Sequence, residues 1–241
     1  MTGLFEPLTL KFGGTTIVLD ADGGLFLPEH RLLAVADIHL EKGNAFARRG
    51  MPIPPYDTNA TLDRLVRLCA RHDAQTVVSM GDAFHDRAGP AGLEPGQVEC
   101  LRALTQRYDW LWLAGNHDPQ PWLGAGGLTE TTIEIGPLTL VHEPGSSGKA
   151  FEIAGHLHPK ARLRGRALGV SRPCFALDQQ RLIMPAFGAY TGGLNVLDPA
   201  IATLLAASFS AVILGDKRLF RLPAAKLTPD PPRWQMVLEN E

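Results

Sequence analysis

The sequence contains few cysteines, no long apolar run and no excess of charge of either sign. Only three of its 241 residues are cysteines, and no two of them form a CxxC pair. This excludes a disulfide framework and a thiolate zinc site, and it favours the reducing cytoplasm. No run of about 18 apolar residues is present, and the N-terminus lacks a basic start followed by an apolar segment. We therefore expect neither a membrane span nor a secretion signal.

The charges are nearly balanced. Lys and Arg number 23 and Asp and Glu number 25, which gives a formal net charge of −2. This balance excludes a protein coated in positive charge, so any contact with nucleic acid must come from a local basic patch. A hydrophobic fraction of 45% is typical of a globular protein, and a chain of this length can bury a core without disulfides. The composition leaves the oligomeric state open, and a homo-oligomer is compatible with it.

Short apolar and β-branched runs, bounded by turn residues, recur along the chain and predict buried strands. They lie at 15–19, 32–36, 76–80, 110–114, 138–142, 151–154 and 211–214. Two helices are predicted between the early strands, at 58–72 and 95–107, and the first half therefore reads βαβαβ. The second half is β-rich, apart from an ambiguous stretch at 201–207.

The first predicted helix has a clear apolar pattern. Asp57 is its expected N-cap, because a carboxylate there can accept a hydrogen bond from a free N–H of the first turn. Its apolar positions, at helical spacing, are Leu62, Leu65, Val66, Leu68 and Cys69.

These elements predict an α/β fold in which two β-sheets pack as a sandwich flanked by helices, in αββα layers. No Ser-rich or charge-rich linker divides the chain, so residues 1–241 are expected to form one domain. The segment 224–241 contains a Pro-Asp-Pro-Pro run and is expected to be a loosely ordered tail.

Most of the eight histidines directly follow the predicted strands, where the loops at the carboxyl ends of a sheet gather reactive groups. His30 and His72 are the exceptions and are expected at the surface. Five loops carry polar side chains that bind metals. They read Asp37-Ile38-His39, Gly81-Asp82, Gly115-Asn116-His117-Asp118, His142 and Gly155-His156-Leu157-His158.

These residue types are those needed to hold two divalent cations close together: carboxylate and amide oxygens, neutral imidazoles, and one carboxylate able to bridge both ions. In the DIH and HLH blocks, the outer residues point to the same side of an extended backbone. We expect the glycines before Asp82, Asn116 and His156 to let the backbone turn sharply. Nitrogen and oxygen ligands without cysteine permit Mn, Fe, Zn or Co.

The five blocks occur in the order D-x-H, GD, GNH[DE], H and GHxH, and in this respect the sequence resembles the calcineurin-like metallophosphoesterase superfamily. The resemblance implies a binuclear, metal-dependent phosphoesterase. It implies that Asp82 bridges the two ions and that His117 is not a ligand. It divides the other ligands into Asp37, His39 and His158 on one metal, and Asn116, His142 and His156 on the other.

The chemistry of such a site follows from its charge. A hydroxide held between the two ions is the expected nucleophile, because a cation lowers the pKa of water toward about 7. The departing alkoxide needs a proton. We expect His117 to supply it as a general acid, and Asp118 to orient the imidazole ring.

Within the superfamily, longer segments resemble the PdeM group, the ligase-associated DNA damage response endonucleases. They include LFLPEHRLLAVADIHLEKGNAFARRG (25–50), GDAFHD (81–86), AGNHDP, VHEP, AGHLHP and PAFGAYTGGLNVLDP (185–199). This resemblance implies a manganese-dependent phosphodiesterase that cuts single-stranded DNA in DNA repair. It also implies a helicase, an exonuclease and an ATP-dependent DNA ligase as partners.

Two basic clusters are candidates for a DNA groove. Lys160, Arg162, Arg164 and Arg166 alternate after the HLH block, so on a strand they would face one side and could follow a phosphate backbone. The alternative is a solvated edge strand that discourages aggregation.

The second cluster, Lys42, Arg48 and Arg49, follows the DIH block. His85 and Asp86 are expected to line the groove or to support the ligands.

The aromatic residues divide by position. Trp110 and Trp112 lie in a predicted strand and are expected in the core. Trp122 and Tyr190 lie near the ligand loops and are better candidates for stacking on bases.

Two other functions remain open from the sequence. A phosphoesterase of cyclic nucleotides or other small substrates would use the same metals, but its activity would depend little on salt or chain length. A non-catalytic scaffold of the same fold would have lost ligands, whereas all five blocks are intact here.

Overall fold

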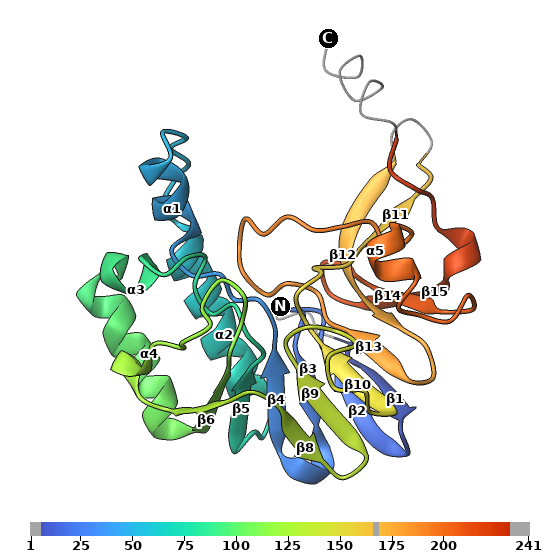
Figure 1. The fold of residues 1–241 in the computed structure, drawn as a ribbon, viewed down its shortest axis with the longest axis horizontal. Helices are drawn as coiled ribbons and strands as arrows, with labels where there is room; N and C mark the ends of the chain where they lie inside the picture. The colour runs from blue at the N-terminus through green and yellow to red at the C-terminus, as the bar shows by residue number, and fades with distance from the viewer. Residues whose placement is uncertain (1–5, 166–168, 232–241) are drawn as a thin grey trace.

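Two β-sheets lie face to face in the computed structural model, which describes residues 6–165 and 169–231 (Figure 1). In the described chain, the first sheet has seven strands in sequence order. They are β1 (Leu8–Phe12), β2 (Thr15–Leu19), β3 (Leu25–Leu27), β4 (Leu32–Val35), β5 (Thr76–Ser79), β6 (Asp109–Leu113) and β7 (Leu128–Glu130). Strands β1 to β4 are antiparallel neighbours, and β4 to β7 are parallel.

The second sheet has the order β15-β14-β12-β13-β10-β9-β8, with β11 paired to β12 off this path. Its strands are β8 (Ile133–Ile135), β9 (Leu138–Val141), β10 (Phe151–Ala154), β11 (Lys160–Leu163), β12 (Val170–Leu177), β13 (Arg181–Ile183), β14 (Ser210–Leu214) and β15 (Leu219–Pro223). Strand β10 is parallel to both β9 and β13.

The helices lie outside the two sheets. They are α1 (Lys42–Arg48), α2 (Asp57–Arg71), α3 (Gly89–Gly92), α4 (Pro95–Arg107) and α5 (Pro199–Ala202). Short 3₁₀ turns occur at Pro28–His30, Leu123–Ala125 and Ala224–Lys226. Helices α2 and α4 cover the first sheet, whereas α5 and the turn Ala224–Lys226 cover the second (Figure 1).

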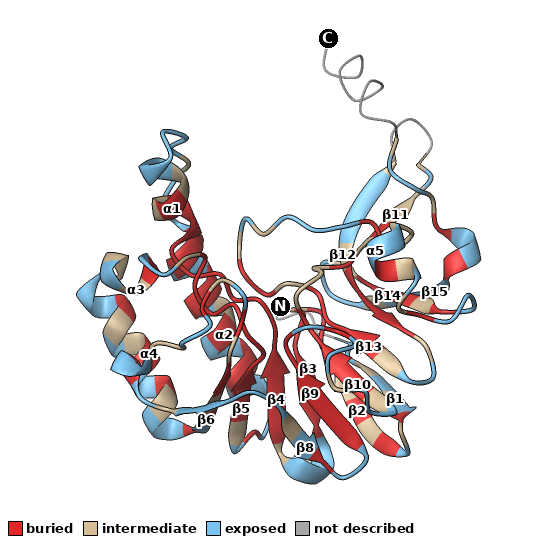
Figure 2. Cartoon of the chain, in the orientation of Figure 1, coloured by how far each residue is buried: buried red, intermediate tan, exposed pale blue. Residues whose placement is uncertain are grey.

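Three apolar cores hold these layers together, and Figure 2 shows them as buried strands and helix faces. The middle core lies between the sheets and includes Ile17, Leu25 and Phe175. A second core joins α2 and α4 to the first sheet, and a third joins α5 to the second. The predicted αββα layering is therefore confirmed, although short elements rather than long helices form its last layer.

Most predicted elements are present with shifts of one residue at their ends. Helix α4 and strand β10 have the predicted limits, and Trp110 and Trp112 are each 2% exposed in the core, as expected. No separate range was predicted for helices α1 and α3 or for strands β1, β3, β7, β8, β12, β13 and β15, most of which have at most five residues. The ambiguous stretch at 201–207 contains only the end of α5.

Three local predictions are wrong. Asp57 is the first residue of α2 and not its cap; its carboxylate accepts a hydrogen bond from the Gly43 backbone at 3.0 Å. Val66 faces solvent, with 41% exposure. His72 is not a free surface residue, because its ring stacks on Phe26 and pairs with Asp20.

Part of the predicted tail is packed on the second sheet. Ala224 and Leu227 are buried, and the Thr228 N–H donates to the carbonyl of Arg162 at 2.9 Å. Residues 232–241 lie outside the described part of the chain. None of the helices in the described ranges is long and apolar enough to cross a membrane.

We predict that Leu65→Ala lowers the free energy of unfolding by about 2–5 kcal/mol, because Leu65 is fully buried between α2 and the first sheet. The neighbouring Val66→Ala is the matched control and should change it by less than about 0.5 kcal/mol. Urea denaturation of both variants measures the difference. Equal losses would contradict the orientation of α2.

A second prediction concerns Asp20, whose buried carboxylate accepts hydrogen bonds from Arg71 at 2.6 Å and His72 at 2.9 Å. Burial raises the pKa of Asp20, but the hydrogen bonds from His72 and Arg71 outweigh it and leave the pKa below its ordinary value. The ionised group therefore stabilises the fold above about pH 4, and this stability is lost as the pH falls through the lower, folded-state pKa.

Asp20→Asn should thus lower the free energy of unfolding by about 2 kcal/mol at pH 7, and the deficit should shrink below about pH 4. Asp73→Asn is the control, because its carboxylate is 85% exposed and its pairing with Arg31 contributes less than about 1 kcal/mol. Urea denaturation at pH 3 to 7 checks both. A deficit that did not depend on pH would contradict the ion-pair explanation.

Candidate metal centre

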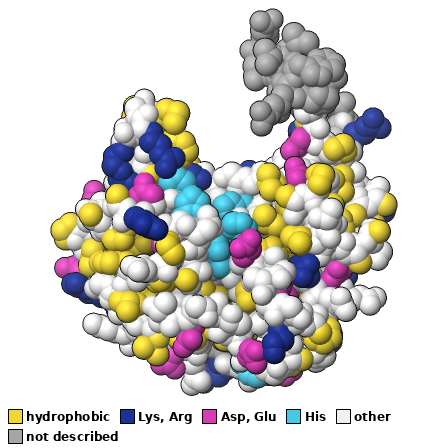
Figure 3. All heavy atoms as spheres, in the orientation of Figure 1, with side chains coloured by type: hydrophobic (Ala, Val, Ile, Leu, Met, Phe, Trp, Pro, Cys, Tyr) yellow, Lys and Arg dark blue, Asp and Glu magenta, His cyan; other side chains and the backbone are white. Residues whose placement is uncertain are grey.

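The candidate ligands meet where strands of both sheets end. Asp37, Asp82 and Asn116 follow the parallel strands β4, β5 and β6, and His142 and His156 follow the parallel strands β9 and β10. A β-bridge between Ala36 and Ala186 joins the two sheets at this edge. In the space-filling view, histidine side chains line a hollow between two projecting parts of the surface (Figure 3).

The structure brings six of the candidates into two groups, each with ligand atoms within 4.8 Å of one another. These groups are Asp37, His39 and His158, and Asp82, His142 and His156. They match the division that the resemblance implies.

Asp82 belongs to the second group and also faces the first. Its Oδ1 is 3.6 Å from Nε2 of His142, and its Oδ2 is 3.9 Å from Nε2 of His39. One oxygen therefore faces each group, which is the placement that a bridging carboxylate requires.

Several lone pairs in the site face one another with no hydrogen between them. His142 donates its Nδ1–H to the carbonyl of Met80 at 3.0 Å, which leaves a lone pair on Nε2. That atom lies 3.0 Å from the Asn116 side-chain oxygen, which is also an acceptor. Asp37 Oδ1 is buried with no hydrogen-bond partner, 3.4 Å from Nε2 of His158. Divalent cations would satisfy these atoms, so the residues present fit a metal centre.

Burial favours the neutral form of two ligand imidazoles, His39 and His156, and this is the form that binds metals. Desolvation, followed by repulsion from His158, lowers the pKa of His39 to about 2. Desolvation and the nearby His142 also lower the pKa of His156. These histidines need not release a proton at neutral pH before they coordinate an ion.

The ligand loops have unusual backbone conformations. Among the described residues, positive φ angles occur at Asp37 (53°), His39 (46°), Asp82 (47°), His156 (71°) and His158 (46°). Residues other than glycine seldom adopt positive φ angles, and backbone strain of this kind is typical of functional sites.

The glycines before the ligands serve two purposes, only one of which was predicted. Gly81 has φ of 79° and makes the expected sharp turn. Gly115 and Gly155 do not have positive φ. They are needed for space, because a Cβ at Gly115 would overlap Asp82, and one at Gly155 would lie 2.7 Å from Asp37 Oδ2.

His117 stands beside the two groups and belongs to neither. Its side chain is 39% exposed, and its Nε2 lies 4.0 Å from Asp82 Oδ2. Its Nδ1–H donates to the backbone carbonyl of His85 at 2.7 Å, so Nε2 faces the site.

The group that orients His117 differs from the prediction. Asp118 does not hold the ring; its Oδ2 accepts from the backbone N–H groups of Ala83 at 2.8 Å and Phe84 at 3.3 Å. Burial, and then the charge of Asp82, raise the pKa of Asp118 to about 6. A backbone carbonyl leaves no sequence signal, so the orienting role of His85 could not be predicted.

His85 also joins the site to helix α1. Its ring stacks on His117 and on Phe46, with centroids 5.4 Å and 5.9 Å away. Both carboxylate oxygens of Asp86 accept a hydrogen bond from the Arg48 guanidinium, each at 2.8 Å. Arg48 and Asp86 therefore neutralise each other rather than both lining a groove, whereas Arg49 is exposed and forms no such pair with any residue that the structure describes.

Lys42 begins helix α1 and Lys160 begins strand β11, two residues after His158. Lys42 is 8% exposed, and its pKa is lowered by burial and by Lys160, against the influence of Asp57. Lys160 and Arg162 share one side of β11, as predicted, but the strand ends at Leu163 and Arg164 lies beyond it. Arg166 lies outside the described residues.

A further loop supports the ligands and escaped prediction. The backbone N–H of Gly188 donates to the carbonyl of Asp37 at 3.0 Å, and Gly193 lies against the carbonyl of His158. The sequence signals were the glycines of segment 185–193 and the resemblance of segment 185–199 to the PdeM group. Tyr190, a stacking candidate, lies on this loop with 49% exposure and φ of 61°.

A family model described as calcineurin-like phosphoesterase matches residues 30–166, more than half of the chain. The chain belongs to the calcineurin-like phosphoesterase family. The nuclease MPE from Pseudomonas putida, whose crystal structure is known, has 30% sequence identity to this phosphoesterase. The similarity covers 90% of this chain and 100% of that chain, with a TM-score of 0.74. This similarity is consistent with the resemblance to the PdeM group.

More distant structures are also similar. Vacuolar protein sorting 29 from Cryptosporidium parvum is 17% identical, with a TM-score of 0.32 over 83% of this chain and 97% of that one. Vps29 from Entamoeba histolytica, complexed with zinc, is 16% identical, with a TM-score of 0.34 over 80% of this chain and 97% of that one. No curated protein matches the phosphoesterase.

We predict that Gly81→Ala impairs metal binding by this phosphoesterase, because a Cβ at this position would overlap the His142 ring and φ there is positive. Gly96→Ala is the control, since nothing lies within 4 Å of its added Cβ. Elemental analysis of the dialysed proteins measures bound metal. Wild-type metal content in Gly81→Ala would contradict the assigned role of this glycine.

Proposed function

We propose that this phosphoesterase is a single-domain, cytoplasmic endonuclease of single-stranded DNA that acts in DNA repair. It would use two divalent ions, with manganese as the metal that the PdeM resemblance implies. A helicase, an exonuclease and an ATP-dependent DNA ligase are the expected partners. The similarity to the nuclease MPE over nearly the whole chain supports a nucleic-acid substrate.

One observation carries the proposal: two converging ligand groups lie at the floor of an open hollow with basic side chains beside it. The Lys and Arg side chains gather on the projecting part of the surface that contains α1 (Figures 1 and 3). An open, basic hollow suits a polymer that must pass across the site. A small substrate would favour a closed pocket that buries most of its surface.

The residues would have the following roles in the proposed reaction. Asp37, His39 and His158 would hold one ion, Asn116, His142 and His156 the other, and Asp82 would bind both. The ions supply positive charge for the phosphate and make water more acidic. In its doubly protonated form, His117 would donate the Nε2 proton to the leaving oxygen and keep its Nδ1–H on the His85 carbonyl, which turns Nε2 to the site.

Lys42, Arg49 and Lys160 would bind phosphates on either side of the scissile bond. Asp118 would hold the loop at 83–84, and with it the bridging Asp82, in place. Arg162 and Arg164 are more distant candidates for the same groove.

Covalently closed circles of single-stranded DNA test the proposal, because a circle has no ends for an exonuclease. We expect Mn²⁺-dependent linearisation by the wild type. If a small phosphodiester were hydrolysed while the circle survived, the small-molecule alternative would be supported. If neither were hydrolysed by the metal-loaded protein, the scaffold alternative would stand.

We predict that His117→Ala keeps its metal and loses about 10²–10⁴-fold in the cleavage rate, the usual contribution of a positioned proton donor. Elemental analysis and single-turnover cleavage measure the two quantities separately. The control is His30→Ala, which changes an exposed histidine on the 3₁₀ turn that precedes β4, at the opposite end of that strand from Asp37. Loss of metal from His117→Ala would contradict its assignment as a non-ligand.

We also predict that Lys160→Ala and Arg49→Ala each weaken cleavage of a long single strand and reduce the salt slope of binding by about 0.7. Lys11→Ala, on β1 away from the ligand loops, is the matched control. Binding measured from 50 to 200 mM salt gives the slopes. Unchanged slopes in both variants would contradict a groove formed by these residues.

A further inference from the structure

A pocket of about 370 Å³ adjoins the metal centre and contains none of the proposed metal ligands. Apolar and polar side chains line it in equal number. The apolar ones are Phe84, Pro90, Pro119 and Trp122, and the polar ones are Asp86, Arg87, Asp118 and Gln120. Its volume is near the lower end of the range for small-molecule sites, which suits one flat ring system.

The pocket lies on the His117 side of the centre. Asp118, which follows His117 in the chain, forms part of its wall. Asp86 also lines it and follows His85, whose carbonyl holds the His117 ring. A group attached to the oxygen that His117 protonates would therefore extend toward this pocket.

The aromatic wall is fixed in orientation before any ligand binds. The Trp122 and Phe84 rings meet edge to face, with centroids 5.8 Å apart and an interplanar angle of 87°. The Trp122 indole lies so close to Gly124 that a Cβ there would overlap the ring. A rigid aromatic surface loses little conformational entropy when a flat ligand stacks on it.

We propose that this pocket binds the nucleobase of the leaving nucleoside, with Trp122 as the stacking surface. The inference rests on the proposed nuclease function and on His117 as the proton donor. Stacking tolerates every base, since each has a π face, so the pocket favours DNA over small phosphates without selecting a sequence. Arg87, which is exposed and lines the pocket, offers a positive charge to the next phosphate along the strand.

Single-stranded oligonucleotides with one cleavable phosphodiester, flanked by methylphosphonate linkages, test this inference. One substrate carries all its bases, and two others lack the base on one side or the other of the cleavable bond. Mass spectrometry of the products shows which nucleoside retains the phosphate and which one leaves. Cleavage is compared for wild type, Trp122→Ala, Trp122→Phe and the control Phe220→Ala.

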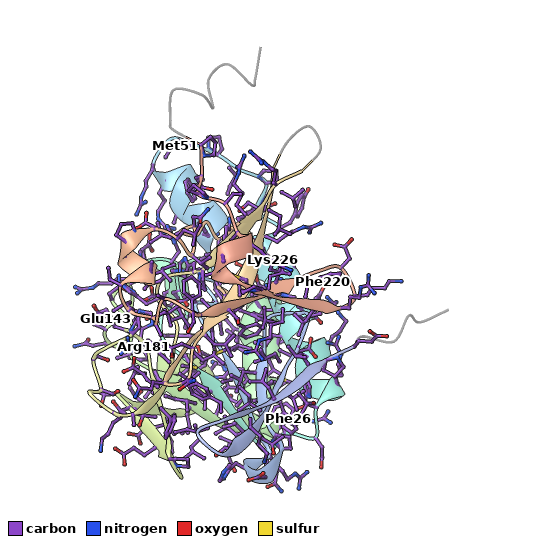
Figure 4. The ribbon with its side chains drawn as sticks, turned by 90° about the vertical axis from the view of Figure 1, so that its right-hand side faces the viewer. Phe26, Met51, Glu143, Arg181, Phe220 and Lys226 are labelled. Carbon is purple, nitrogen blue, oxygen red and sulfur yellow. The ribbon has the colours of Figure 1, made fainter. Side chains whose placement is uncertain are left out.

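Phe220 is a suitable control because it is an exposed aromatic residue on β15, in the second sheet and away from the ligand loops (Figure 4). Melting temperature and bound metal of each variant report on folding. The wild-type comparison of intact and abasic substrates needs no variant, so it tests the inference even if Trp122→Ala is unstable.

We expect removal of the leaving-side base to slow the wild type about tenfold, and removal of the other base to have a much smaller effect. Trp122→Ala should be slowed about tenfold on the intact substrate and no further on the leaving-side abasic one. Trp122→Phe and Phe220→Ala should resemble the wild type.

Two results would overturn the inference while leaving the nuclease function intact. One is equal wild-type rates with and without the leaving-side base. The other is a Trp122→Ala defect of the same size on the intact and abasic substrates. If the wild type cleaved neither these oligonucleotides nor the closed circle of single-stranded DNA, the proposed function itself would be wrong and the inference would fall with it.

Discussion

The burial of two carboxylates among four ligand histidines is the constraint on which the rest of this structure depends. Asp37 and Asp82 are at most 1% exposed, and an ionised carboxylate in such a place costs several kcal/mol unless it is compensated. Backbone N–H groups compensate only in part, since His156 donates to Asp37 Oδ2 and His117 donates to Asp82 Oδ1. The remaining oxygens face imidazole lone pairs, and divalent cations satisfy both kinds of group at once.

The fold supplies the geometry for this arrangement. Parallel strands in both sheets end at one edge, so side chains far apart in the sequence meet there. His39 and His158 are separated by 119 residues, yet their Nε2 atoms lie 3.2 Å apart. The backbone adopts strained φ angles at the ligands, and three glycines give the ligand side chains room. The apolar cores on both sides of the sheets provide the stability that this strain requires.

Helix α1 and the loop at 84–86 connect the candidate metal centre to the wall of the hollow. Helix α1 contacts the loop at 84–86 through Phe46 and Arg48, and that loop orients His117 through a backbone carbonyl. If the proposed function holds, a change in α1 on contact with DNA would reach His117 through only a few contacts. The proposed nucleobase pocket, which Phe84 and Asp86 line, would give the same loop a second role.

Much of this could be predicted from the sequence, because the ligand types and their order after buried strands are local features. Asp37-Ile38-His39 and His156-Leu157-His158 are recognisable without a structure, as are the apolar periodicities of α2 and α4. What escaped prediction depends on tertiary contacts. The hydrogen bond from His117 to the His85 carbonyl, the pairing of His72 with Asp20 and the space required at Gly115 arise only when distant segments pack together.

The number of ions bound by the metal-free wild-type protein tests the central claim most directly. Calorimetric titration with Mn²⁺ at neutral pH, checked by elemental analysis after dialysis, measures it. The account predicts two ions per chain. A single ion, or none, would contradict a centre in which Asp82 joins two metal sites.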